Sequence, residues 1–293
     1  MKLINFFSSS AIIACSLFLF AGCYNNSRTD STVLTLDSCS SDTIYLKPVG
    51  EDTAKTIASL KAIYVVEGAD SIKDFVNACV MLRLYYCNGT EDDTVALCLT
   101  SSDMQKEVAH LYGAPLPSLS IAQVMSNTQR KLVDCYKKDT QGLESTMGYE
   151  YHVDVKLLPI TDSLITCVTD KYCYYGGAHG SSIRTYDNLD LSSGRVLGFK
   201  DIFKEGIELQ LRPLLIKGLC TYFDCQPDSL DQQLLFVSSA QLPLPVSAPG
   251  LTEEGIVFRY QQYEIACYAA GSPEVVIPYS ELKGLMKITI PAK

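Results

Sequence analysis

Apolar and polar residues alternate most regularly between positions 149 and 157. The odd positions hold Tyr, Tyr, Val, Val and Leu, and the even positions hold Glu, His, Asp and Lys. A period of two predicts a strand with one buried and one solvated face, as in an antiparallel sheet. Shorter or similar runs predict further strands at 62–67, 94–100, 164–174, 183–191, 195–199, 255–260 and 274–278.

Apolar residues follow helical spacing at 102–111, at 121–137 and in the segment after Asp201. Pro213 either kinks that last helix or marks its first turn. Residues 72–86 are ambiguous, because helical spacing gives way to a strand-like end. Since strands and helices are grouped rather than alternating, we expect an α+β fold with antiparallel sheets, packed helices and two lobes.

Changes in composition divide the chain. Residues 24–43 are rich in Ser, Thr, Asn and Asp, which predicts a flexible tether. We expect an N-terminal α+β lobe at 44–148 and a C-terminal α+β domain at 149–293, with a break near 138–148.

The first 23 residues have the pattern of an export signal. Lys2 is followed by a mostly apolar run at 11–20 and then by Ala21, Gly22 and Cys23. This pattern predicts a lipoprotein signal peptide with lipidation at Cys23; an ordinary secretory signal or an uncleaved anchor are the alternatives. The expected location is the cell envelope of a Gram-negative bacterium, where the chain is a periplasmic or outer-membrane lipoprotein held to the membrane by its N-terminal lipid.

The composition excludes one class of partner. The chain has a net charge of −9, and nucleic-acid binding depends on clustered Lys and Arg. An acidic surface favours either a cationic partner or simply solubility.

Twelve cysteines are present, of which Cys15 and Cys23 belong to the signal segment. In an oxidising compartment the other ten permit up to five disulfides, although many lie in apolar runs where a free Cys behaves as a small hydrophobe. Two local pairs are plausible, Cys167 with Cys173 and Cys220 with Cys225.

The sequence offers little recognisable catalytic chemistry. Its three histidines, His110, His152 and His179, lack the spacing of a helical zinc site, and neither a nucleophile elbow nor a P-loop occurs. We therefore expect no metal and no cofactor, and we name no catalytic residue. A nucleophilic site assembled from distant residues remains an alternative.

One loop is a candidate binding site. Three glycines surround His179 in the segment Gly176–Gly180, directly after a predicted strand. Glycine accepts positive φ, so the loop presents His179 from a constrained backbone, or it is a purely structural turn. The chain has eighteen tyrosines and no tryptophan, and aromatic faces suit sugars and protein interfaces as well as ordinary packing. The candidate residues are Tyr175, Gly176, Gly177, His179, Tyr263 and Tyr268.

Five short blocks in order carry a resemblance to a known family. They are YYGGAHG at 174–180, YDNLDLSSG at 186–194, DIF at 201–203, YEIACYAAG at 263–271 and VVIPY at 275–279. This set resembles domain of unknown function family 3298, over residues 149–293. That domain is similar to the extracellular region of the lysozyme-sensing anti-sigma factor RsiV and to a non-catalytic region of the peptidoglycan deacetylase PdaC. Cys267 departs from the pattern, since proline is expected there.

The resemblance implies an α+β fold and an extracytoplasmic binding role, and it brings no catalytic set. The first hypothesis is therefore a lipid-anchored, non-enzymatic binding module for a protein, such as a cationic lysozyme-like muramidase, or for a cell-wall component such as peptidoglycan. The alternative is a hydrolase that acts on envelope polysaccharide with a site near His179. A structural lipoprotein without a small ligand is the third possibility.

Overall fold

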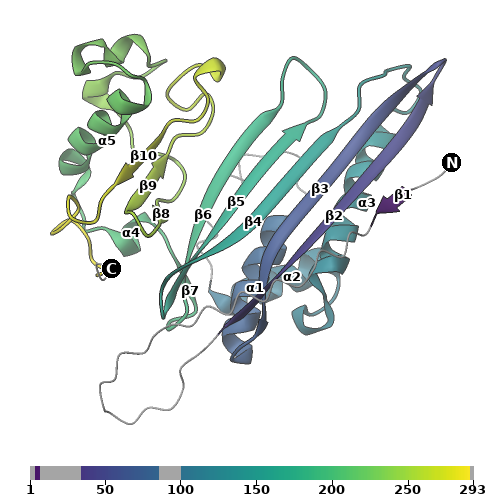
Figure 1. Cartoon of the computed structure of the whole chain (residues 1–293), viewed down its shortest axis with the longest axis horizontal. Coiled ribbons are helices and arrows are strands. Elements are labelled where there is room, and N and C mark those ends of the chain that lie inside the picture. Colours follow the sequence, from purple (N-terminus) through teal and green to yellow (C-terminus); the bar gives the residue numbers. More distant parts are fainter. Residues whose placement is uncertain (1–3, 7–33, 86–99, 291–293) are drawn as a thin grey trace.

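The computed structural model describes residues 4–6, 34–85 and 100–290. A seven-stranded sheet dominates it, with the strands in chain order from β1 to β7 (Figure 1). The strands are β1 (Ile4–Phe6), β2 (Thr35–Val49), β3 (Asp52–Glu67), β4 (Glu150–Thr161), β5 (Leu164–Tyr174), β6 (Ser181–Asp190) and β7 (Arg195–Leu197). All neighbouring pairs are antiparallel except β3 and β4, which are parallel.

Helices α1 (Asp70–Leu84), α2 (Ser101–Tyr112) and α3 (Ile121–Asp139) lie against one face of this sheet, with a short 3-10 turn at Leu116–Ser118 (Figure 1). A capping box at Ser120 starts α3, because its hydroxyl accepts the amide N–H of Gln123 and the Gln123 side chain accepts the amide N–H of Ser120. The helices bury their apolar faces on the odd-numbered residues of β4, and the alternation at 149–157 is thus confirmed as a half-buried strand.

The C-terminal part has a hydrophobic core of its own. It contains α4 (Phe199–Ile202), α5 (Glu208–Tyr222), β8 (Gly250–Leu251), β9 (Ile256–Arg259) and β10 (Glu274–Ile277), with 3-10 turns at Pro227–Gln232, Ser239–Gln241 and Tyr268–Ala270. The three strands form an antiparallel sheet in the order β10-β9-β8. Helix α5 packs closely on β10, because a Cβ at Gly218 would lie 2.1 Å from a methyl carbon of Val275. We call this part the C-terminal body.

The C-terminal body covers part of the sheet face that the helices leave open. The Asn188 side chain, on β6, donates to the carbonyl of Pro249 at 2.8 Å and accepts the amide N–H of Leu251 at 2.9 Å. Val168 and Tyr186 on the sheet form a small apolar cluster with Val257 of β9. These contacts fix the body above β5 and β6.

The α+β class is confirmed, and several details of the prediction are corrected. The sheets are not purely antiparallel, since β3 and β4 run parallel. Residues 35–43 belong to β2 rather than to a tether, because their backbone pairs with β3 along its length whatever the polarity of their side chains. Residues 72–86 start as a helix, α1, which ends at Leu84.

The boundary between the two cores also differs from the expected one. Strands from both sides of the expected boundary at position 148 belong to one seven-stranded sheet, and the second core is built mainly from residues after Leu197. Residues of the signal segment other than 4–6, including Cys23, lie outside the described residues. So does the strand expected at 94–100, except Thr100. Within the described ranges, no helix has the length and apolar character needed to cross a bilayer.

The cysteines in the described part of the chain are all free thiols. Cys167 and Cys173 both lie in β5, six residues apart, which is about 20 Å along a strand and too far for a disulfide. Their predicted pairing is therefore wrong. Cys220 and Cys225 are close, since the amide N–H of Cys225 donates to the carbonyl of Cys220 at 3.0 Å, but both are free thiols and the predicted disulfide is not formed in the structure.

Candidate functional site

The predicted glycine-rich loop connects β5 to β6. Gly176 and Gly177 have φ values of 92° and 98°, which L-residues with a side chain rarely adopt. The Tyr174 hydroxyl donates to the carbonyl of Gly177 at 3.0 Å and holds the turn. A Cβ at Gly180 would lie 2.4 Å from the hydroxyl oxygen of Tyr172, so a side chain at this position would displace the Tyr172 ring.

His179 is held at both ring nitrogens. Nδ1 lies 3.0 Å from the carbonyl oxygen of Gly180, and Nε2 lies 3.1 Å from the hydroxyl oxygen of Tyr263. A carbonyl only accepts, so we assign the proton of the neutral ring to Nδ1, and Nε2 then accepts from the Tyr263 hydroxyl. The Tyr268 hydroxyl donates to the same Gly180 carbonyl at 2.9 Å.

Three of the six candidate residues thus lie together. The rings of His179 and Tyr268 stack with centroids 3.8 Å apart, and the Tyr263 ring lies 5.8 Å from that of Tyr268. Tyr263 is 52% exposed and has a φ of 67°, an uncommon backbone conformation for an aromatic residue. Such strained, exposed positions cluster at functional sites, which favours a binding role for this cluster.

Tyr175 lies apart from these rings. It meets the ring of Tyr149 edge-on at 5.2 Å and packs against the core beneath the helices. Gly176 and Gly177 shape the loop.

Two further aromatic residues extend the cluster across the sheet. Tyr172, on β5, packs against Gly180, and its ring lies 5.8 Å from that of His152 on β4. Burial, with the neighbouring Glu150 and Tyr268, raises the pKa of Tyr172. We call the five rings of His152, Tyr172, Tyr268, His179 and Tyr263 the aromatic strip. His152 and Tyr172 were not among the candidate residues predicted from the sequence. Both are aromatic residues on the polar face of a strand, at even positions of strands whose odd positions are buried, and this pattern could have identified them.

A groove of about 310 Å³ lies beside the strip, on the open face of β3 to β6 and against Arg259 of β9. We call it the sheet groove. Its lining residues are Ser59, Lys61, His152, Val153, Asp154, Asp170, Lys171, Tyr172, Ser182, Ile183 and Arg259. His152 and Tyr172 belong to both the strip and the groove, so the two form one continuous surface.

Ion pairs organise the charged side chains around the groove. Asp170 accepts from Nε of Arg184 at 2.5 Å and lies 3.3 Å from Nζ of Lys156. Burial raises the pKa of Asp170, but the two cations outweigh burial and lower it below its usual value. Asp170 is thus ionised at neutral pH and unsuited to the role of a general acid, which in glycosidases needs a raised pKa.

The alternative of catalysis by His179 lacks its usual partners. Among the residues that the structure describes, neither a carboxylate nor a serine hydroxyl hydrogen-bonds to the His179 ring. A nucleophilic site needs a base oriented by a third group and in reach of a nucleophile. The observed contacts, a carbonyl and a phenol, hold the ring in one orientation.

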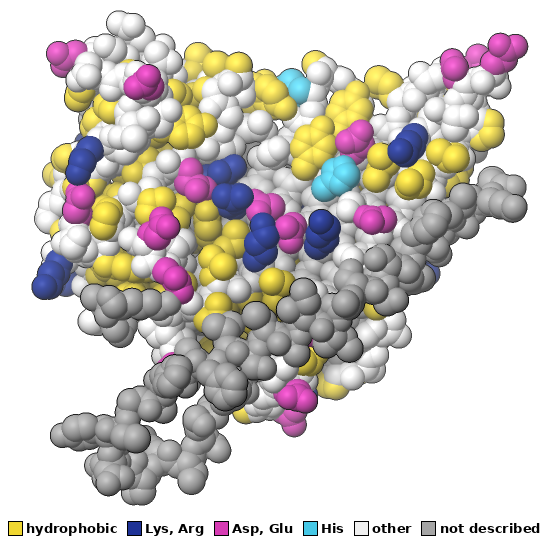
Figure 2. Space-filling model, viewed as in Figure 1, with side chains coloured by type: hydrophobic (Ala, Val, Ile, Leu, Met, Phe, Trp, Pro, Cys, Tyr) yellow, Lys and Arg dark blue, Asp and Glu magenta, His cyan; other side chains and the backbone are white. Residues whose placement is uncertain are grey.

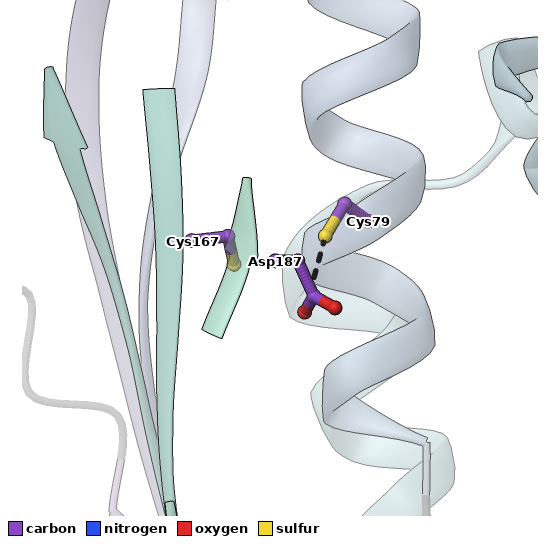
Figure 3. Close-up of side chains that lie close together, drawn as sticks. All are labelled: Cys79, Cys167 and Asp187. Carbon is purple, nitrogen blue, oxygen red and sulfur yellow. Dashed lines mark hydrogen bonds between the residues drawn. The ribbon is translucent and has the colours of Figure 1, made fainter. Parts of the chain in front are cut away.

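A second group of polar residues is buried between α1 and the sheet. Cys79, Cys167 and Asp187 bring their sulfur and carboxylate atoms within 4.8 Å of one another (Figure 3). Both carboxylate oxygens of Asp187 accept from Arg83 at 2.6 Å, so its charge is already compensated. The interaction with Cys167 and burial raise the pKa of the Cys79 thiol, which keeps it protonated, whereas metals bind the thiolate. Cys79, Cys167 and Asp187 therefore fit a metal ion poorly, and Asp187 forms a buried ion pair with Arg83.

Comparisons with known proteins agree with the fold. Residues 200–280 match the family described as "Protein of unknown function (DUF3298)". This match covers three of the five resembling blocks and begins after the glycine-rich loop. The chain is also 27% identical over 163 residues to the peptidoglycan-N-acetylmuramic acid deacetylase PdaC of Bacillus subtilis (strain 168). That alignment covers 54% of this chain but only 34% of PdaC, so the chain spans about a third of that relative.

Two solved structures share the architecture. A DUF3298 family member from Bacteroides fragilis superposes with a TM-score of 0.59 at 19% identity, covering 90% of this chain and 97% of that one. A DUF3298 family protein from Pseudomonas aeruginosa PAO1 gives a TM-score of 0.54 at 19% identity, covering 87% and 94%. The chain therefore carries a DUF3298 domain at residues 200–280, within a fold that two proteins of this family share over almost their whole length.

Proposed function

We propose that this chain is a lipid-anchored, non-enzymatic protein of the bacterial cell envelope that binds the glycan strands of peptidoglycan. The aromatic strip carries this proposal. It is a cluster of aromatic rings in which His179 and Tyr268 stack on one another, Tyr263 is open to solvent, and His152 and Tyr172 continue into the sheet groove. The apolar faces of sugar rings pack on aromatic side chains, while neighbouring polar groups fix the orientation of the ligand.

Two other observations support the choice of ligand. The curated relative is named for its action on the N-acetylmuramic acid of peptidoglycan, which makes that polymer the first ligand to test. The signal pattern ending at Cys23 would place the mature chain in the envelope, where peptidoglycan lies. The absence of a carboxylate or serine partner around His179 in the described structure favours binding over hydrolysis.

The binding experiment uses the purified full chain and a soluble disaccharide-repeat glycan of peptidoglycan, titrated by calorimetry. We expect saturable binding that weakens about tenfold or more in the Tyr172→Ala and Tyr268→Ala variants, because each stacked ring contributes on the order of 1–2 kcal/mol. Leu209→Ala is the control, since Leu209 is 73% exposed on α5 outside the strip. Unchanged affinity in both tyrosine variants, or no heat at all, would refute the proposal.

Net charge favours a second candidate, a cationic lysozyme-like protein. Field complementarity accelerates the encounter of an acidic chain with a basic one and makes it salt-dependent. Titration with a lysozyme at low and moderate salt tests it. Salt-sensitive saturable heat would support a receptor or inhibitor role, and absence of heat at both salt concentrations would remove this candidate.

The anchor and the hydrolase alternative have tests of their own. Metabolic labelling with a fatty acid should mark the wild-type chain and not the Cys23→Ala variant, and labelling of both would contradict lipidation at Cys23. Turnover of peptidoglycan that is lost in His179→Ala while binding persists would establish the hydrolase instead.

A further inference from the structure

Strand β10 is an unpaired edge of the three-stranded sheet. The strand order β10-β9-β8 gives it one neighbour, β9. The amide N–H of Tyr260 donates to the carbonyl of Pro273 at 2.8 Å, and the backbone groups of successive residues then point alternately to the two sides of the strand. Val275 therefore faces β9, whereas the N–H and C=O groups of Glu274 and Val276 point outward. In the part of the chain that the structure describes, these outward groups have no hydrogen-bond partner.

A groove of about 270 Å³ lies along this edge, between β10 and α5. We call it the edge groove. Helix α5 supplies five residues at helical spacing, which lie on one of its faces: Leu214, Lys217, Gly218, Thr221 and Tyr222. The other wall is the whole of β10, and Figure 1 shows α5 beside this strand. An exposed sheet edge with side-chain pockets beside it is a place where an extended peptide adds as a further strand.

The charged side chains of the edge groove are already paired. Nζ of Lys217 lies 3.3 Å from a carboxylate oxygen of Glu281, and Glu274 accepts from Nη1 of Arg259 at 3.0 Å. The rest of the lining is uncharged, and the apolar Val276 is 43% exposed. Figure 2 shows scattered charged side chains among apolar ones over the C-terminal body, at the upper left of the view, without the cluster of Lys and Arg seen at the centre. A charge on the ligand would lose hydration here without gaining a partner, so the groove favours an uncharged segment.

Prolines limit the length of the exposed edge. Pro273 directly precedes β10, and Pro278 directly follows it. Proline has no N–H to donate, so a ladder of hydrogen bonds along this edge does not extend past these two positions. The edge therefore takes one short segment, whereas a long unpaired edge would promote aggregation.

We infer that the edge groove binds an extended segment of another protein, about five residues long, whose side chains are uncharged and apolar at alternate positions. The segment adds to the small sheet as a further strand, and its backbone hydrogen-bonds to Glu274 and Val276. Its alternate side chains point to the face of the sheet that α5 covers and contact Leu214 and Thr221. The edge groove and the sheet groove lie on different elements, so this inference does not depend on glycan binding.

The test titrates a synthetic peptide into the isotopically labelled full chain and follows backbone amide signals by NMR. The probe is a pentapeptide that alternates serine and valine, acetylated at one end and amidated at the other. We expect saturable shifts at the amides of Glu274 and Val276. Peptides with glutamate or with lysine in place of valine should bind about tenfold more weakly, because their charges find no partner in the groove.

Methylated peptides identify strand addition. Because the backbone groups of a strand point alternately to its two sides, the serines supply the donors on one side of the peptide and the valines supply those on the other. N-methylation of the set that faces β10 should weaken binding about tenfold or more, and N-methylation of the other set should leave the affinity unchanged. A peptide that bound through its side chains alone would not show this difference.

Variants locate the site. Val276→Pro removes an outward N–H from an edge strand, where proline is tolerated, and should abolish binding. Thr221→Arg leaves the backbone of the edge intact and fills the groove from α5, so it should weaken binding about tenfold. Leu209→Arg is the matched control, because Leu209 is 73% exposed on α5 outside the groove. Far-UV circular dichroism verifies that each variant is folded.

Each outcome decides for or against the inference. Weaker binding of one methylated peptide, together with weaker binding in both groove variants, supports it. Absence of shifts, equal affinity for the two methylated peptides, equal affinity for the charged peptides, or binding that persists in Val276→Pro and Thr221→Arg overturns it. Sedimentation velocity of the chain alone covers the other occupant: a concentration-dependent dimer that Val276→Pro abolishes, without peptide binding, overturns the inference and assigns the edge to a second copy of this chain.

Discussion

Replacing Asp187 by asparagine should destabilise this protein more than any surface change. The side chain of Asp187 is fully buried and that of Arg83 is 6% exposed, and they share two hydrogen bonds of 2.6 Å. Burial alone would lower the pKa of Arg83, but the charge of Asp187 more than offsets it and raises that pKa. The Asp187→Asn variant keeps the size of the side chain and leaves a buried guanidinium without its counter-charge.

Two estimates of the loss agree. Breaking a buried pair by removing one partner costs about 3–5 kcal/mol. The two hydrogen bonds to charged groups, at about 1.5–3 kcal/mol each, give about 3–6 kcal/mol. For a protein of this size about 4 kcal/mol lowers Tm by roughly 10 °C. Thermal and urea unfolding, followed by far-UV circular dichroism, measure the loss.

A double variant separates an uncompensated charge from lost packing. In Arg83→Met with Asp187→Leu no charge remains, so its loss should be smaller than that of Asp187→Asn alone. Glu281→Gln is the control, because the pair of Glu281 with Lys217 is exposed and is worth less than about 1 kcal/mol. A loss below about 1 kcal/mol in Asp187→Asn, or a double variant as damaged as the sum of its parts, would refute the reasoning.

Three further predictions concern alkali, thiols and the glycine-rich loop. Burial raises the pKa of Tyr149 and of Tyr279 to about 12, above the value near 10 of an unfolded chain; stability should therefore be full below about pH 10 and fall as the pH rises toward 12. Tyrosinate absorbance and circular dichroism against pH check this, and a titration complete near pH 10 with the fold intact would contradict it. A short pulse of alkylating reagent should label exposed Cys267 and spare buried Cys79 in the folded protein, and mass mapping that finds equal labelling would show the helix–sheet core to be open. Gly180→Ala should weaken glycan binding about tenfold with Tm lowered by only a few degrees, since its Cβ would displace a ring of the aromatic strip, and unchanged affinity would count against that ring.

The sequence predicts those parts of the fold in which side-chain burial has a period. Strand β4 has alternating polarity because helices cover one of its faces, and α3 has an apolar stripe because it lies on the sheet. Strand β2 has no such signal. Its residues are mostly polar or half-exposed. It is a strand because its backbone pairs with β3, and the polarity of the side chains does not reveal that pairing.

The candidate site, like the fold, could be predicted from the sequence only in part. Glycines at 176, 177 and 180 mark a constrained loop, so His179 could be singled out from the sequence. The neighbours of His179 depend on tertiary structure: cross-strand register places His152 opposite Tyr172, and docking of the C-terminal body brings Tyr263 and Tyr268 over the loop. Sequence periodicity contains neither the register nor the docking, and the sheet groove was missed for that reason.

Because the aromatic strip is assembled from the sheet and the C-terminal body, the contacts that join them should control binding from a distance. Glu274, on β10, accepts from Nη1 of Arg259 at 3.0 Å and from the Tyr186 hydroxyl at 3.1 Å, and it lies 3.5 Å from Arg184. We expect Glu274→Gln to weaken glycan binding by about tenfold, since it loosens the contact between the sheet and the C-terminal body without lining the sheet groove.

Calorimetry with the soluble disaccharide-repeat glycan of peptidoglycan measures the effect of Glu274→Gln beside that of Tyr172→Ala. If Glu274→Gln left the affinity unchanged while Tyr172→Ala abolished binding, the sheet would bind the ligand without the C-terminal body. The DUF3298 segment at 200–280 would then contribute to the fold but not to the site.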